Sequence, residues 1–373
     1  MTHDEYHQHA YRMIAYISVS LGIRTIDQLQ PHADELSDIY QVAKKHRVTA
    51  MVAFALQKAG IRHEEFLSSK GMAIQKSALY DIEAEKVFSL LENARIRYLP
   101  LKGMLIKKLY PQVEMREMTD IDILFDKRHA EEVRDILLKE GYECATFGKT
   151  NHDIYFKSDF YTIEMHRELF DEVMAPQIDK YYSQKAFLTP DTDRYRCRMS
   201  DEDLYIYLIA HMYQHYSTAG IGIRPLIDIY LYLKRFRDTM DASYIAAELE
   251  KLSLTSYEHD VRQLSQKLWD PQTLSEQERE ELDYYIFSGI YGLKSQHIKN
   301  MIDRSLNSEQ MTKLAYIKKR FRLTPRKIQS SPFYSKHPRL APLMVVTRPV
   351  KALFTRPKAI VRELSFLKKA DKK

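Results

Sequence analysis

The chain has 373 residues, of which 45% are hydrophobic and 29% are charged. This is an ordinary globular composition, with ample length for a sizeable core and for two or three domains. Two cysteines exclude a disulfide framework and a cysteine metal cluster, as expected in a reducing compartment. The N-terminal residues lack the features of a signal peptide, and no uncharged apolar run approaches the roughly 18 residues that span a bilayer. We therefore expect a cytoplasmic protein with no transmembrane segment.

The first 75 residues have apolar side chains at helical spacing. The helical pattern continues over residues 39–56, where His46 would seat this helical region on the rest of the protein. A further helix, over residues 78–94, leads into a first strand at residues 96–99.

A glycine turn follows this strand. Pro100, Leu101, Lys102 and Gly103 open a short helix expected over residues 104–109. The first turn of a helix presents free backbone N–H groups, so a phosphate could dock there. Lys102 would add a mobile cation, although it could instead point to solvent.

The next strand is expected over residues 119–125 and carries two carboxylates. Because side chains alternate along a strand, Asp120 and Asp122 share one face, roughly 7 Å apart, while Ile121 and Ile123 point into a core. Mg²⁺ usually binds a couple of carboxylates together with substrate phosphates. The pair therefore forms half of a magnesium site, unless it is a solvated strand end.

A helix is expected over residues 127–140, closed by Gly141. Strands follow at residues 142–147, 152–157 and 161–166, the last two joined by a turn at 158–160. On the last strand Glu164 and His166 face one side. Glu164 is a candidate third carboxylate or a surface residue of an edge strand, and His166 would orient a ligand or support one that does.

These motifs resemble the DNA polymerase beta superfamily of nucleotidyltransferases. The closest similarity is to a subgroup of uncharacterised bacterial nucleotidyltransferases with the order L-K-G, Tyr-Pro, Arg and D-I-D. The matching positions here are Leu101-Lys102-Gly103, Tyr110-Pro111, Arg116 and Asp120-Ile121-Asp122. The superfamily's commoner turn is Gly-Ser or Gly-Gly, where this chain has Lys-Gly.

The resemblance implies an α+β fold, in which a small mixed-sheet core is flanked by N-terminal and C-terminal helical regions. It also implies two Mg²⁺ ions held by Asp120, Asp122 and Glu164. Lys102, Arg116 and the turn amides at Gly103 would neutralise a nucleoside triphosphate. Glu164 would also be the candidate general base.

The region after residue 198 is helical, and Ser200 begins a capping signal for a helix. His211 and His215 lie one turn apart on that helix, and the subgroup has a comparable pair followed by Arg and Asp, here Arg224 and Asp228. We expect these four residues to form a buried polar network against the active-site cleft, with substrate contact as the alternative.

From Lys313 onward the chain has eighteen Lys and Arg residues but only two acidic residues. The net charge of this tail is therefore near +16, and that of the remainder is near −10. We expect the tail to fold over the acidic body. Contact with nucleic acid or with an anionic membrane is the alternative.

The expected domains are a helical region at 1–75, a nucleotidyltransferase core at 76–198, a helical domain at 199–312 and a basic extension at 313–373. The predicted function is Mg²⁺-dependent transfer of a nucleoside monophosphate from ATP or another nucleoside triphosphate to an acceptor hydroxyl. A catalytically inactive nucleotide-binding or antitoxin-like interaction protein on the same scaffold is one alternative. A nucleic-acid binder that uses the tail is another.

Overall fold

The computed structural model describes residues 1–29, 33–158, 161–172, 175–188, 195–218, 220–289, 338–344 and 347. Its contacts divide the chain into one unit of Met1–Tyr216 with Ile221–Tyr291 and a second unit of Ser217–Gly220 with Gly292–Lys373. Most of the basic tail, residues 313–373, lies outside the described residues. The prediction that this tail folds over the acidic body therefore concerns residues outside the described part of the chain. A 3-10 helix, η7 (Pro338–Leu343), is described in the second unit.

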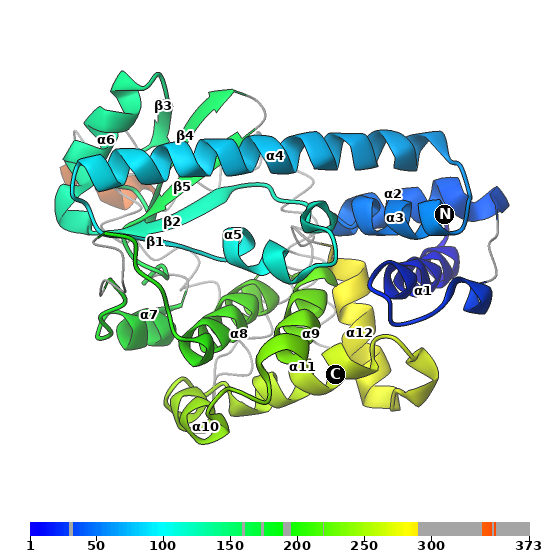
Figure 1. The fold of residues 1–373 in the computed structure, drawn as a ribbon. Coiled ribbons are helices and arrows are strands. Elements are labelled where there is room, and N and C mark those ends of the chain that lie inside the picture. The colour runs from blue at the N-terminus through cyan, green and yellow to red at the C-terminus, as the bar shows by residue number, and fades with distance from the viewer. Residues whose placement is uncertain are drawn as a thin grey trace. The chain divides into compact units, whose positions relative to one another are not determined.

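The centre of the first unit is a five-stranded mixed sheet with the order β1-β2-β5-β4-β3. Strand β5 is parallel to β2, whereas the β1–β2, β4–β5 and β3–β4 pairs are antiparallel. The predicted α+β class, with helices flanking a mixed sheet, is confirmed (Figure 1). The strands are β1 (Tyr98–Pro100), β2 (Ile121–Phe125), β3 (Glu143–Thr146), β4 (His152–Ser158) and β5 (Tyr161–His166).

One face of this sheet is apolar. Ile121 and Ile123 are fully buried there, as their alternation with the acids predicts, in a core shared with Ile163 of β5. Helices α4 (Glu64–Asn93) and α6 (Ala130–Lys139) cover this face. The polar side chains of β2 and β5 are therefore left on the opposite face.

The N-terminal helices are α1 (His3–Ser20), α2 (Leu36–His46) and α3 (Thr49–Lys58). The helical pattern expected over residues 39–56 is divided between α2 and α3, because Arg47 takes a left-handed conformation with φ 55° and ends α2. His46 is buried and accepts from the Ile223 backbone N–H at Nδ1. This hydrogen bond joins the end of α2 to Ile223, which directly precedes the helix over residues 224–236.

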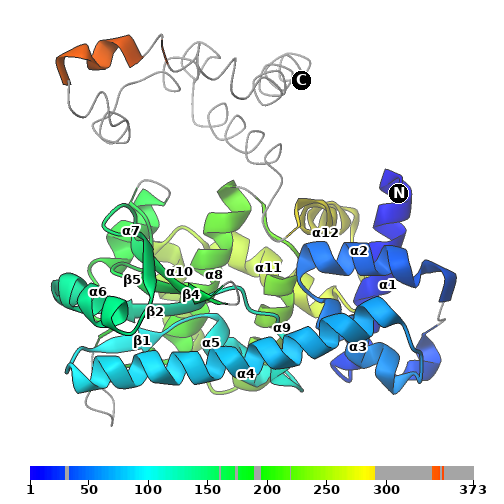
Figure 2. The ribbon, with the colours of Figure 1, turned by 90° about the horizontal axis from the view of Figure 1, so that it is seen from above.

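Helix α4 is longer than the helix expected over residues 78–94. It runs from the sheet to α2 and α3, as both views show (Figure 2). The division expected at residue 75 falls within this helix. The four-domain division stays a prediction about which parts fold independently.

The connection from β1 to β2 holds the glycine turn. The helix expected over residues 104–109 is shorter, since α5 (Gly103–Ile106) passes into a 3-10 turn, η3 (Lys107–Leu109). A further turn, η4 (Val113–Met115), leads toward β2. Strand β2 begins at Ile121, so Asp120 precedes the strand instead of lying within it.

Further helices lie on the other side of the sheet from α4 (Figure 1). None of the helices in the described residues is both long enough and apolar enough to cross a membrane. The helices are α7 (Pro176–Tyr182), α8 (Asp201–Thr218), α9 (Arg224–Phe236), α10 (Ala242–Lys251), α11 (Thr255–Lys267) and α12 (Glu276–Ser288).

Candidate active site

A cavity of about 430 Å³ lies where the polar face of the sheet meets α8 and α9. We call it the acidic cavity because its wall carries the carboxylates of β2 and β5. The cavity is lined by all the site residues expected from the sequence and by other side chains. The expected residues are Lys102, Gly103, Arg116, Asp120, Asp122, Glu164, His166, His211, His215, Arg224 and Asp228. The fold therefore gathers residues from the glycine turn, two strands and two helices.

Two of the carboxylates are neighbours in the sheet. Asp122 of β2 and Glu164 of β5 are register partners on adjacent parallel strands. Strand β5 is the middle strand of the sheet, so Glu164 is not the surface residue of an edge strand that the sequence left as an alternative. Both side chains project to the face opposite the apolar core.

Asp122 is the most strongly paired acid of the site. Its Oδ1 accepts hydrogen bonds from Lys102 Nζ at 2.8 Å and from His166 Nε2 at 2.9 Å. Burial opposes ionisation, but these two partners hold the pKa of Asp122 well below its ordinary range. Burial likewise opposes protonation of His166, yet its bonds to Asp122 and Glu164 raise its pKa. Asp122 is thus an ionised carboxylate inside a buried network.

Asp120 has a different environment. Burial and the nearby Asp122 carboxylate raise the pKa of Asp120 to about 6. Lys102 and a hydrogen bond from Thr119 Oγ1 at 3.0 Å only partly offset this effect. A raised carboxyl pKa means that one negative charge at this position lacks enough compensation.

Lys102 adopts a backbone conformation that side chains rarely take, with φ 42°. Such conformations cost about 1 to 3 kcal/mol and cluster at functional sites. Here the turn directs the Lys102 ammonium onto Asp122, and the pKa of Lys102 is raised by this carboxylate although burial acts in the opposite direction. The lysine expected to meet a phosphate therefore neutralises a candidate metal ligand in this structure.

His152 is a residue of this site that the sequence reasoning missed. It is the cross-strand partner of His166, and its Nε2 lies 3.7 Å from Glu164 Oε2. Ligand atoms of His152, Glu164 and His166 lie within 4.8 Å of one another, so this trio could hold a metal ion. The signal in the sequence was the histidine that opens the neighbouring strand, but only the β4–β5 register shows that it faces His166.

The donor chemistry of the cavity can be tested against Mg²⁺. Asp120, Asp122 and Glu164 supply the oxygen ligands that this ion prefers. The Lys102 ammonium already places a cation at Asp122, and the pKa of Asp120 indicates an excess of negative charge. The carboxylates present therefore fit Mg²⁺, whereas the imidazoles of His152 and His166 would favour a transition metal.

Arg116 and Asp228 form a buried pair at the edge of the cavity. Arg116 Nε and Nη2 each donate to a carboxylate oxygen of Asp228 at 2.9 Å, and Tyr110 Oη donates to the same carboxylate at 2.7 Å. Arg224 lies one turn before Asp228 on α9 and also lines the cavity. It donates to the Glu117 backbone oxygen at 2.6 Å. This network ties α9 to the β1–β2 connection.

Gly103 lies against this pair. A Cβ at position 103 would come within 2.7 Å of Arg116 Nη1 and 3.0 Å of Met118 Cε. The structure therefore gives a packing reason for this glycine besides the expected access to a phosphate.

His211 and His215 of α8 complete the wall. Their Nε2 atoms lie 3.2 Å apart. Desolvation lowers the pKa of His211 well below its ordinary value, and the Lys102 ammonium lowers the pKa of His211 and of the more exposed His215. Both imidazoles are neutral at pH 7, so they can form hydrogen bonds to a ligand without adding charge.

Comparison with known families identifies a match that covers more than half of the chain. The family model described as "Uncharacterised nucleotidyltransferase" matches residues 32–270. Searches of curated proteins and of solved structures give no match. The matched residues include the whole sheet, the glycine turn and the part of α9 that lines the acidic cavity.

Proposed function

Because the chain belongs to the uncharacterised nucleotidyltransferase family, we propose that it is a Mg²⁺-dependent enzyme that transfers a nucleoside monophosphate. The donor would be a nucleoside triphosphate and the acceptor a hydroxyl group. The observation that carries this proposal is the placement of Asp120, Asp122 and Glu164 on the wall of one cavity. The cytoplasmic location expected from the sequence is part of the same proposal.

In this proposal the three carboxylates hold up to two Mg²⁺ ions. When bound, Mg²⁺ neutralises the triphosphate and lowers the pKa of the attacking hydroxyl. Lys102 would leave Asp122 and contact phosphate oxygens, where a charged donor binds about twice as strongly as a neutral one. The neutral His211 and His215 would orient the nucleotide or the acceptor by hydrogen bonds.

The transfer balances without a further reactant. The acceptor oxygen forms a bond to the α-phosphorus while the bond from that phosphorus to the bridging oxygen of the β-phosphate breaks. Pyrophosphate leaves, and Glu164 accepts the hydroxyl proton. Most of the catalysis would come from positioning and charge neutralisation.

An inactive nucleotide-binding or interaction protein remains the alternative on the same scaffold. A Glu164 that lay away from the other carboxylates would favour this inactive alternative. In the structure Glu164 is the register partner of Asp122. The nucleic-acid alternative depends on the tail, which lies mostly outside the described residues. Salt-sensitive retention of RNA or DNA, lost in a variant that ends at Thr312, would support that alternative.

The test of the proposal is transfer of α-labelled nucleotides into cell extract and into a panel of hydroxyl compounds. We expect Mg²⁺-dependent labelling that Asp120→Asn, Asp122→Asn and Glu164→Gln each reduce at least a hundredfold. Asp126→Asn is the matched control, since this acid follows the same strand but pairs with exposed Arg128. Undiminished Mg²⁺-linked nucleotide binding and transfer in the three site variants would overturn the assignment.

A further inference from the structure

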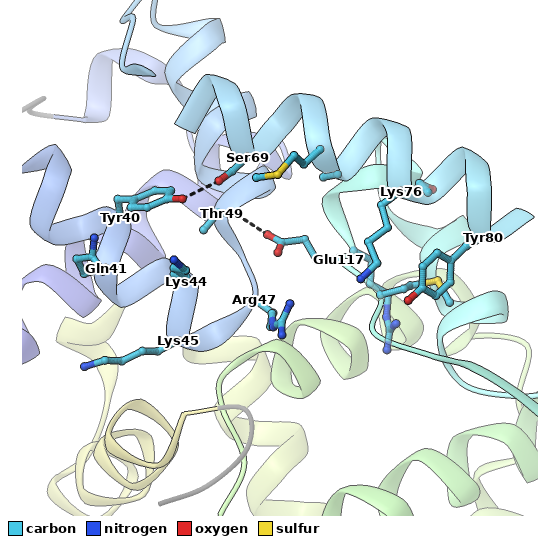
Figure 3. Close-up of a pocket in the computed structure, with 15 residues that line it drawn as sticks. Tyr40, Gln41, Lys44, Lys45, Arg47, Thr49, Ser69, Lys76, Tyr80 and Glu117 are labelled. Atoms are coloured by element: carbon cyan, nitrogen blue, oxygen red, sulfur yellow. Dashed lines mark hydrogen bonds between the residues drawn. The ribbon is translucent and has the colours of Figure 1, made fainter. Parts of the chain in front are cut away.

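A second cavity, of about 630 Å³, is shown in Figure 3. It lies between the end of α2, the start of α3, the middle of α4 and the segment that enters β2. Arg116 and Met118 line both cavities. Because most of the charged side chains that line this second cavity are cations, we call it the basic cavity.

The basic cavity has a strong excess of positive charge. Its cations are Lys44, Lys45, Arg47 and Lys76, besides Arg116, whose charge is paired with Asp228. Glu117 is the single carboxylate among the described residues that line it. Glu117 is already engaged, since it accepts from Thr49 Oγ1 at 2.7 Å and from the Ala50 backbone N–H at 2.9 Å. Its charge thus helps to begin α3 and compensates the lysines only in part.

Two of these cations extend into the same space from different elements. Figure 3 shows Arg47, at the end of α2, and Lys76, on α4, on either side of Glu117. Lys45 extends away from them, and its Nζ lies 4.4 Å from the ring centroid of Tyr6. Burial lowers the pKa of Lys76, and Arg47 acts in the same direction.

The position of Arg47 adds a second observation. It ends α2 in a left-handed conformation, a place where glycine is the usual residue. A side chain in this conformation costs roughly 1 kcal/mol, and here it belongs to one of the cations that line the cavity.

Lys76 also connects the two cavities electrostatically. Asp120 acts on the pKa of Lys76 in the direction opposite to burial, so the ammonium is within electrostatic reach of a proposed metal ligand. Because Arg116 and Met118 line both cavities, an anion held by Lys76 would lie in a cavity that shares a wall with the acidic cavity.

We propose that the basic cavity binds the phosphate group of a small phosphorylated acceptor, whose hydroxyl reaches the acidic cavity. This inference rests on the proposed function and names the substrate class of that site. A phosphate presents about two negative charges and several acceptor oxygens, which suits a lysine and arginine cluster. The volume is that of a small-molecule site, and Met72, Ala73 and Tyr80 supply an apolar wall for the rest of the ligand.

The first experiment measures binding without nucleotide and in EDTA, so that it does not depend on catalysis or on metal. Ribose 5-phosphate and ribose are titrated by calorimetry, with inorganic phosphate and pyrophosphate as further probes. We expect the wild type to bind ribose 5-phosphate at least tenfold more tightly than ribose. Lys44→Met and Lys76→Met should each lower the affinity for ribose 5-phosphate about tenfold or more.

Two control variants separate this result from other causes. Lys70→Met removes a lysine of the same helix α4 that lies over the Phe54 ring instead of lining the cavity, and it should change nothing. Asp122→Asn should retain probe binding although it abolishes the proposed transfer. Failure of the proposed function and failure of the basic cavity are thus distinguishable.

The second experiment identifies the lysine directly. Pyridoxal 5′-phosphate condenses with a lysine amine with loss of water, and borohydride reduces the resulting C=N bond to a stable secondary amine. We expect this reagent, but not pyridoxal, to label Lys76, and ribose 5-phosphate to protect it. Peptide mass spectrometry locates the label.

Three outcomes would overturn the proposal. The phosphorylated probes could bind the wild type no better than ribose. Binding could persist in a Lys44→Met/Lys76→Met double variant whose thermal melting matches the wild type. Labelling by the phosphorylated reagent could distribute over surface lysines, including Lys70, with no protection of Lys76.

Discussion

Asp122 on β2 and Glu164 on β5 occupy the same register position of two adjacent parallel strands. This pairing sets two carboxylates side by side on the polar face of the sheet. Lys102 and His166 both bond to Asp122, so the buried charge is compensated in the metal-free protein. The site therefore combines carboxylates that fit Mg²⁺ with a lysine that competes for one of them.

The competition by Lys102 predicts opposite effects on two ligands. In Lys102→Met we expect the affinity for Mg²⁺ alone to rise about tenfold, because Asp122 Oδ1 loses its ammonium partner. The affinity for Mg²⁺-ATP should instead fall roughly ten- to a hundredfold, since the proposed phosphate contact is lost. Calorimetric titration of Mg²⁺, ATP and AMP measures both.

Lys108→Met is the matched control for this variant, because Lys108 is an exposed lysine of the adjacent 3-10 turn. If Lys102→Met lowered the affinities for AMP and for ATP by the same factor, Lys102 would not contact the β- and γ-phosphates. An unchanged affinity for Mg²⁺ would show that Lys102 does not compete with the metal.

The raised pKa of Asp120 predicts a gain of stability on neutralisation. Its folded pKa of about 6 lies above the ordinary 3.8, so the unfolded chain releases this proton first. Stability is consequently lost as the pH rises from about 4 to about 6, and Asp120→Asn removes that loss. At pH 7.5 in EDTA we expect Asp120→Asn to be more stable than wild type by about 1 to 3 kcal/mol.

Urea denaturation at pH 4.5, 6 and 7.5 measures this effect, which should shrink toward the acid end. Asp135→Asn on the exposed surface of α6 serves as the control and should show no such trend. A less stable Asp120→Asn at pH 7.5 would contradict a poorly compensated carboxylate at this position.

The contact between Gly103 and Arg116 predicts a coupled pair. Gly103→Ala would place a methyl group 2.7 Å from Arg116 Nη1, and Arg116 is held by its two bonds to Asp228. We expect a loss of stability of about 1 to 3 kcal/mol, measured by thermal or urea unfolding. Most of this loss should vanish in an Arg116→Ala background, where the clash is absent.

Gly71→Ala provides the comparison on α4, because a Cβ there meets nothing within 4 Å. Helix propensity alone predicts that this change stabilises the protein by about 0.5 to 1 kcal/mol. If Gly103→Ala cost the same in both backgrounds, the contact with Met118 rather than with Arg116 would explain the glycine.

Local patterns in the sequence were sufficient to predict the polar and apolar faces of β2, and the resemblance carried by the motifs predicted the α+β class. The alternation of Ile121, Asp122 and Ile123 is a property of a single strand, so it needs no knowledge of distant contacts. The motifs around the glycine turn likewise gave the family. Both are local signals that the tertiary structure leaves unchanged.

Other features were decided only when distant segments met. The bonds to Asp228 are one example, because packing of α9 against the β1–β2 connection supplies Arg116 and Tyr110, which are distant from Asp228 in the sequence. His152 joins the site only through the register of β4 with β5. The basic cavity needs α2, α3, α4 and Glu117 together, and no short stretch of sequence encodes that meeting, because helix docking depends on side-chain packing throughout the unit.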